Sequence, residues 1–329
     1  MKDRDPYFDN LKAILIFLVV LGHFTNLNDG SPLVAAVNNV IYSFHMPLFI
    51  FVTGYFSKTI HTQRSAEIEN VLYPYLFFQL LGYLFTRLTG LGYGTMNIFV
   101  PAYQNWYLLG VFIWRLLIPY YNFFTTKYAL LLTLVLSFYI GYIDGFNQFL
   151  GLYRIIYFFP VFILGYYCSD MKELLLKYSN YRYVFISVSL VGLLAIFLAS
   201  FFSSALNKQL SYAYTPYLNY DHHFQNFILR LIGFFSSLII STGLLFLIPK
   251  RKIRITRLGE GTLNIFLLHT FFVFPISHYM KNVSGYLVLL ISVTSSILIC
   301  VILSSRFANE IAKPFTKMRQ LSLLIKRNR

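Results

Sequence analysis

Long apolar segments recur along this 329-residue chain, and they limit its fold more than any other feature. The length of each segment is close to the about 20 residues that a helix needs to cross a bilayer. Hydrophobic residues make up 57% of the chain and charged residues only 12%, against about 25% charged residues in soluble domains. The sequence therefore predicts an all-α, polytopic integral membrane protein with about ten transmembrane helices. The expected spans cover residues 11–29, 39–57, 73–93, 105–121, 128–143, 152–168, 183–203, 226–248, 262–280 and 284–304.

The basic residues are distributed unevenly between the loops that join these spans. The formal net charge of +15 is compatible with nucleic-acid binding, but membrane proteins also concentrate Lys and Arg in their cytosolic loops. If the N-terminus is cytosolic, the cytosolic side holds 21 of the 27 Lys and Arg residues, and the other side holds only Lys208 and Lys281. We therefore expect an N-in/C-in topology, with the lipid bilayer and no nucleic acid as a partner.

Composition divides the chain into a membrane domain, residues 1–305, and a basic tail, residues 306–329. The tail mixes basic and apolar residues, which is typical of a segment that lies on the inner leaflet. The external loop at about 204–225 is rich in tyrosine, and both sugar stacking and an interfacial aromatic belt would explain this. Cys168 and Cys300 lie inside apolar runs and form neither a disulfide framework nor a metal-ligand pattern.

The first span lies within "FDNLKAILIFLVVLGH" and carries two basic side chains, Lys12 and His23. A membrane helix that lacked them would insert more easily. At 100° per residue, the eleven residues from Lys12 to His23 amount to three turns plus about 20°, so both lie on nearly one face, about 16 Å apart along the axis. We expect Lys12 at the cytosolic mouth and His23 beyond the middle of the membrane. An ionisable group at that depth is a functional candidate, although a structural hydrogen-bonding role is the alternative.

Other polar side chains inside expected spans could share a cavity with His23. His45 precedes Pro47 in the second span, at a depth comparable to that of His23, and His269 falls in the middle of the ninth. For both histidines the alternative is a structural or interfacial role. Arg115 and Arg154 are costly inside a bilayer, which favours an internal cavity as their environment. Trp106 opens the fourth span and suits the membrane interface.

These segments, taken in order, resemble the acyltransferase 3 family of integral membrane acyltransferases, and most of all its bacterial sugar and exopolysaccharide O-acetyltransferase branch. The family's first helix has an Asp-x-Leu lead-in, a basic residue, ten intervening residues and a histidine, which are Asp9, Leu11, Lys12 and His23 here. The segments "FHMPLFIFVTGYF", "NWYLL", "YRIIYFFPVFILGYY" and "LNIFLLH" are similar to later family segments. The resemblance covers residues 5 to about 270.

One segment departs from the family pattern. The family often has a basic cluster just before the third helix, ahead of a Pro-Tyr pair. This chain keeps Pro74 and Tyr75, but the preceding segment reads "RSAEIENVLYPY", in which Arg64 is the only basic residue. Lys58, Arg64 or the basic loop 250–257 are the alternatives for binding the acyl donor.

The resemblance implies a bacterial cell-membrane enzyme that uses cytosolic acetyl-CoA as co-substrate, with no bound cofactor and no metal. The implied acceptor is a hydroxyl of a lipid-linked or cell-surface glycan, with other proteins of a glycan assembly pathway as possible partners. His23 would act as general base or as a transient acyl carrier. The implied substrate-binding residues are Asp9, Lys12, His45, Trp106, Arg154 and His269.

Two other functional classes remain open at this point. A transporter or a lipid-linked glycan flippase would involve no bond chemistry, and many secondary transporters contain internal repeats, of which we find none. A polysaccharide polymerase would need larger external loops to handle its acceptor. Acetyl transfer from acetyl-CoA to the host's glycan, and its dependence on His23, would separate the enzyme from both.

Overall fold

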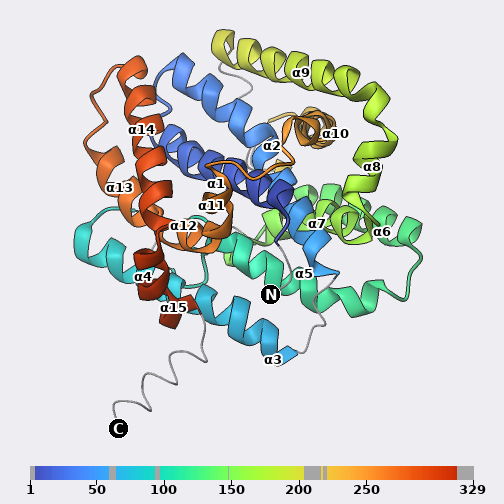
Figure 1. Ribbon diagram of the computed structural model, residues 1–329, viewed down its shortest axis with the longest axis horizontal. Coiled ribbons are helices and arrows are strands. Elements are labelled where there is room, and N and C mark those ends of the chain that lie inside the picture. Colours follow the sequence, from blue (N-terminus) through green and yellow to red (C-terminus); the bar gives the residue numbers. More distant parts are fainter. Residues whose placement is uncertain are drawn as a thin grey trace.

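A computed structural model describes residues 4–58, 64–92, 97–146, 148–203, 216–217 and 221–316, and Figure 1 shows its arrangement. Within these ranges the regular structure is entirely helical. The longer helices are α1 (Pro6–Leu27), α2 (Pro32–Ser57), α4 (Tyr73–Thr89), α5 (Asn105–Tyr121), α6 (Thr126–Tyr139), α7 (Leu152–Tyr167), α9 (Arg182–Phe202), α10 (His223–Leu247) and α14 (Gly285–Leu303). The shorter ones are α3 (Arg64–Glu67), α8 (Met171–Lys177), α11 (Thr256–Glu260), α12 (Thr262–Leu268), α13 (Thr270–His278) and α15 (Arg306–Thr316).

The two N-terminal helices begin at sequence signals that satisfy free backbone N–H groups. The Asp5 carboxylate accepts from the backbone N–H of Tyr7 at 3.1 Å, and Pro6 occupies the first helical position. Ser31 and Pro32 repeat this arrangement at the start of α2. A side-chain acceptor at the cap followed by proline is a favourable helix start, because the missing proline N–H would have no intrahelical partner there.

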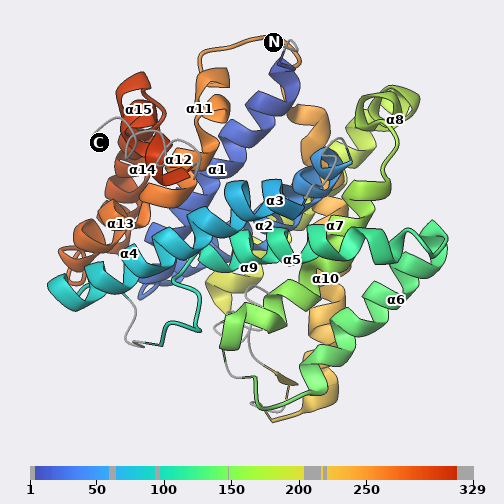
Figure 2. The same ribbon diagram turned by 90° about the horizontal axis from the view of Figure 1, so that it is seen from below.

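The predicted all-helical membrane class is confirmed, while the predicted number of spans remains a prediction. Six helical segments in the described part of the chain are long and apolar enough to cross a bilayer: 6–27, 32–57, 149–167, 179–202, 223–247 and 285–303. Helices also occupy the other four predicted spans, but they are shorter. Helices α4 and α5 have 17 residues each, α6 has 14, and the ninth span is divided into α12 and α13. In Figure 2, α4 and α5 run across the view, whereas α10 runs from top to bottom.

The centre of the molecule is built on α1, α2 and α7, which are long helices with many buried residues. Helices α2 and α7 approach closely at two glycines. A Cβ atom added at Gly54 would lie 2.1 Å from the Phe162 carbonyl oxygen, and one at Gly165 would lie 2.0 Å from that of Phe51. Small residues at such crossings let two membrane helices pack backbone against backbone.

Helices α9 and α14 lie at the periphery and expose apolar side chains. The exposed residues of α9 include Val184, Val188, Leu190, Val191, Leu194 and Leu198, and those of α14 include Leu287, Leu290, Leu298, Val301 and Ile302. A surface of this kind would be unfavourable in water. It suits contact with lipid tails, in agreement with the membrane class.

The basic segments gather at one end of the helical assembly, which is the top of Figure 2: the start of α1, α8, the connection into α11, and α15. Lys172 of α8 forms an ion pair with Asp5, and the Tyr73 hydroxyl donates to the Pro314 carbonyl at 3.2 Å. The N-in/C-in prediction makes this the cytosolic end. Helix α15 forms the first part of the predicted tail; residues 317–329 of that tail lie outside the described residues.

Candidate functional site

Two of the predicted site histidines lie in direct contact. The His23 Nδ1 atom is 2.7 Å from the His269 Nε2 atom, although the two residues are 246 positions apart. Their rings stack with centroids 4.9 Å apart and an interplanar angle of 22°. His23 is 8% exposed and His269 is 0% exposed. We refer to this pair as the histidine dyad.

The hydrogen bonds of the dyad determine where its protons lie. His269 Nδ1 faces the Ile265 carbonyl oxygen at 2.8 Å, and a carbonyl only accepts, so this nitrogen carries the proton. In neutral His269 the Nε2 atom is then an acceptor, and His23 Nδ1–H donates to it. Neutral His23 therefore has a lone pair on Nε2. A lone pair on a buried imidazole can take a proton or attack a carbonyl carbon.

His269 lies where its helix is interrupted. Helix α12 ends at Leu268 and α13 begins at Thr270, and His269 stands between them with helical φ and ψ of −60° and −33°. Its backbone N–H still bonds to the Ile265 carbonyl at 3.0 Å. The ninth predicted span therefore consists of two short helices, α12 and α13, on either side of His269.

His45 and Arg154 contribute to the electrostatic environment of His23. His45 is buried and donates from Nδ1 to the Ile41 carbonyl at 2.7 Å. The Arg154 guanidinium lies over the Trp106 ring at 4.7 Å from the ring centroid. The fold thus brings His269 into direct contact with His23, while Trp106 contributes an aromatic face to Arg154.

Arg115, which the sequence analysis also placed at an internal cavity, has a different environment. Its Nη1 atom lies 3.2 Å from the buried carboxylate of Glu67, and its Nε–H donates to Ser57 Oγ at 3.0 Å. It connects α5 to α2 and α3. The carboxylate of Glu67 gives the Arg115 charge the close partner that a charge inside the protein needs.

Asp9 and Lys12 form a separate cluster at the basic end of α1. Lys12 Nζ lies 2.7 Å from Asp9 Oδ1, and Arg4 binds both oxygens of the same carboxylate at 3.1 Å. The hydrogen bonds that Arg4 donates to the Asp9 carboxylate raise the pKa of the Arg4 guanidinium. Because α1 is continuous from Pro6 to Leu27, eleven residues separate this cluster from His23 by about 16 Å along the axis.

The basic loop 250–257 is attached to α1 beside this cluster. Asn10 Nδ2 donates to the carbonyls of Pro249 and Arg251 at 2.8 and 2.9 Å, and Thr256 Oγ1 donates to Asn10 Oδ1 at 2.6 Å. The cations of this loop are exposed: Lys250, Arg251, Lys252, Arg254 and Arg257. This attachment places five cations at the mouth of α1.

The two other candidates for donor binding differ from this loop. Lys58 Nζ donates to the carbonyls of Cys168 and Ser169, where it caps the end of α7. Residue 64 is described only in its backbone. Unlike Lys58, the cations of the loop 250–257 are exposed.

The sequence analysis missed one part of the site, the connection that precedes α5. The Tyr103 ring meets the His23 ring edge to face, with centroids 4.2 Å apart, and Tyr103 adopts a left-handed φ of 42°. Asn26 of α1 donates to the Tyr103 hydroxyl at 3.0 Å. The only sequence signal is the polar run "YQN" just before the fourth expected span. A residue in a connection has no helical periodicity that would reveal its position.

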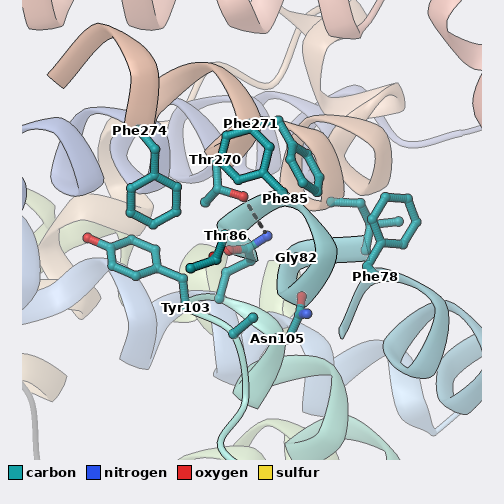
Figure 3. Close-up of a pocket in the computed structure, with 12 residues that line it drawn as sticks. Phe78, Gly82, Phe85, Thr86, Tyr103, Asn105, Thr270, Phe271 and Phe274 are labelled. Atoms are coloured by element: carbon teal, nitrogen blue, oxygen red, sulfur yellow. Dashed lines mark hydrogen bonds between the residues drawn. The ribbon is translucent and has the colours of Figure 1, made fainter. Parts of the chain in front are cut away.

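A pocket begins at Tyr103 and extends between α4, α5 and α13 (Figure 3). Tyr103 and Phe274 lie side by side at one end of the pocket, and Phe78 lies at the other. Thr270, the residue after His269, accepts from Gln104 Nε2 at 3.2 Å across it. The pocket therefore lies next to both histidines of the dyad: its lining residue Tyr103 contacts His23, and its lining residue Thr270 follows His269 in the chain.

Comparisons with known proteins support the resemblance found in the sequence. The family model described as "Acyltransferase domain" matches residues 5–305. A 60-residue segment is 44% identical to nodulation protein NolL of Sinorhizobium fredii; it covers 17% of this chain and 16% of that protein. No solved structure matches the chain. A family match over nearly the whole chain, together with the helical architecture and its apolar surface, shows that the chain belongs to the acyltransferase-domain family of integral membrane proteins.

Proposed function

We propose that this protein is a membrane O-acetyltransferase that moves an acetyl group from cytosolic acetyl-CoA to a hydroxyl of a lipid-linked or cell-surface glycan. The observation that carries the proposal is the histidine dyad, because it presents a lone pair on His23 Nε2 inside the membrane domain. Family membership supports acyl transfer as the type of reaction. The acetyl group and the glycan come from the resemblance to the sugar-modifying branch.

The chemistry at His23 follows one of two balanced routes. In the direct route, Nε2 takes the proton of the acceptor hydroxyl while the hydroxyl oxygen attacks the thioester carbonyl carbon. The C–S bond then breaks, and the CoA sulfur leaves with the proton. In the covalent route, Nε2 itself forms the C–N bond, the C–S bond breaks and CoA leaves as a thiolate. The hydroxyl oxygen then attacks the acyl carbon, the C–N bond breaks, and the hydroxyl proton neutralises the thiolate.

The contact with His269 assists both routes. In either one, His23 gains positive charge at the moment when Nε2 binds a proton or an acyl carbon. The Nδ1–H bond to His269 then becomes charge-assisted and strengthens. Arg154 and His45 would orient substrate or stabilise the developing oxyanion.

The donor enters from the basic end in this proposal. CoA carries phosphates, and the exposed cations of the loop 250–257 lie beside the start of α1 with Lys12. Positive charge is the feature that phosphate recognition needs. Since the dyad lies about 16 Å further along α1, the acetyl group would travel toward the external half of the membrane. Such an enzyme would act in the bacterial cell membrane, alongside other proteins of glycan assembly.

The test uses membranes that contain the protein, labelled acetyl-CoA and the host's glycan fraction. We expect label in the glycan with the wild-type protein, and a loss of about 100-fold or more with His23→Ala, which is the range for a removed general acid–base group. His278→Ala serves as the matched control, because His278 is an exposed histidine on α13 outside the dyad. Transfer by His23→Ala at the wild-type rate, at equal protein abundance, would disprove the assignment.

A further inference from the structure

The pocket beside the dyad combines a mainly aromatic wall with two buried amide oxygens. Asn105 is 1% exposed and Gln104 is 6% exposed, and both line the pocket. Within the described part of the chain, no group donates a hydrogen bond to Asn105 Oδ1 or to Gln104 Oε1. A buried acceptor without a donor is costly, so these oxygens need a hydrogen-bond donor from water or from a ligand.

The neighbouring hydrogen bonds fix which end of the Asn105 amide faces the pocket. Gln79 Oε1 accepts from the backbone N–H of Ala102 at 2.7 Å, so this atom is an oxygen. Asn105 Nδ2 donates to the same oxygen at 3.3 Å. Gln79 Nε2 is in turn held by the carbonyls of Ile98 and Val100. The amide nitrogen of Asn105 is thereby committed to Gln79, and its oxygen is the atom left for a ligand.

The size of the pocket limits what enters it. The space open to a water-sized group is about 30 Å³, and a single water requires about 10–15 Å³ by this measure. The pocket therefore has room for about two heavy atoms. A carbon carrying one hydroxyl fits this volume, whereas a whole sugar ring does not.

We propose that this pocket binds a hydroxyl-bearing branch of the acceptor, of the size of a hydroxymethyl group, whose single O–H donates to Asn105 Oδ1. The inference rests on the proposed function, and it adds a specificity site to it. Tyr103 forms a common wall between this pocket and His23. A sugar anchored here by one hydroxyl would extend past Tyr103 toward the dyad, and aromatic rings such as Phe274 and Phe85 would contact its carbon atoms.

The experiment measures acetyl transfer by the full chain in membranes, with the glycan fraction extracted from the host cell envelope as acceptor. Asn105→Leu removes this acceptor at similar side-chain size. We expect it to raise the half-saturating glycan concentration roughly threefold to tenfold, which corresponds to the loss of one hydrogen bond. The half-saturating acetyl-CoA concentration stays at the wild-type value, because the donor binds at the basic end. Asn226→Leu is the control, since Asn226 is equally buried but lies at the start of α10.

The outcomes separate this inference from the function on which it rests. A wild-type protein that transfers no label to any glycan fraction overturns both. An active wild type whose Asn105→Leu form keeps the normal glycan dependence overturns the pocket assignment alone. The same holds if Asn105→Leu and Asn226→Leu weaken transfer equally, because the effect would then be a general loss of folding. Asn105→Ala is the second variant if the Asn105→Leu protein does not insert.

Discussion

Replacing His269 with phenylalanine tests the dyad most directly. The substitution keeps a ring of similar size between α12 and α13, but it removes the nitrogen that lies 2.7 Å from His23 Nδ1. The Nδ1–H group of His23 then loses its acceptor at the step where His23 becomes positively charged. Hydrogen bonds to charged groups contribute about 1.5–3 kcal/mol. At about 1.36 kcal/mol per factor of ten in rate, kcat/KM should fall about 10-fold to 150-fold.

A glutamine at the same position supplies the conservative comparison. Its amide has one acceptor and one donor group, so the oxygen can accept from His23 Nδ1–H while the nitrogen faces the Ile265 carbonyl. We expect His269→Gln to recover most of the activity that His269→Phe loses. A residue needed only to fill space would give the opposite order, because phenylalanine matches the shape of the ring more closely.

The assay is the initial rate of label transfer from acetyl-CoA to the glycan fraction, with protein abundance and thermal unfolding measured in parallel. The double variant His23→Ala/His269→Phe adds a second criterion. If His269 acts through His23, the second substitution changes little in the His23→Ala background, since the residues work as a unit. The reasoning is refuted if His269→Phe retains wild-type kcat/KM, or if its effect is equally large without His23.

Three further predictions concern the framework and the donor end. Gly165→Ala should lower the midpoint of thermal unfolding by overpacking the crossing of α2 and α7, at a cost of about 1–3 kcal/mol, whereas Gly30→Ala, which meets open space, should leave the midpoint unchanged. Glu67→Ala should destabilise the protein by about 3–5 kcal/mol, because it leaves Arg115 as a buried charge without its carboxylate; an unaltered unfolding midpoint would contradict this. Arg251→Gln should raise the KM for acetyl-CoA without changing glycan dependence, and the wild-type KM should rise with salt, since exposed charges are screened; a KM insensitive to both changes would exclude the loop 250–257 from donor binding.

The fold class could be predicted because it depends on composition and local pattern. Apolar runs near bilayer length allow few structures, since every backbone polar group in lipid must be satisfied within a helix or a closed barrel. The number of spans could not be obtained in the same way. The segments at 73–93, 105–121 and 128–143 have the composition of spans, yet their helices have only 14 to 17 residues. How a short helix lies in the bilayer depends on its packing partners, which the local sequence does not specify.

The candidate site divides along the same line. His23 and Lys12 could be placed relative to each other from the sequence, because both lie on one helix with a fixed rise and rotation per residue. His269 was a candidate for the same cavity, but no local pattern in the sequence indicated its direct contact with His23. The position of Arg115 in a span predicted an internal cavity as its environment, but it could not reveal its ion-pair partner. That partner, Glu67, lies outside the expected spans, and only the folded chain brings the two together.

The sequence by itself determined that this protein is helical and embedded in a membrane, and which face of the first helix is polar, because hydrophobicity and helical geometry act over short distances along the chain. The tertiary structure alone decided the contact of His23 with His269, the proton positions that follow from it, and the pocket formed by Tyr103, Gln104 and Asn105. These features join α1 to segments between 80 and 246 residues away, and such contacts arise from the packing of whole helices. They determine which nitrogen of His23 is available for chemistry.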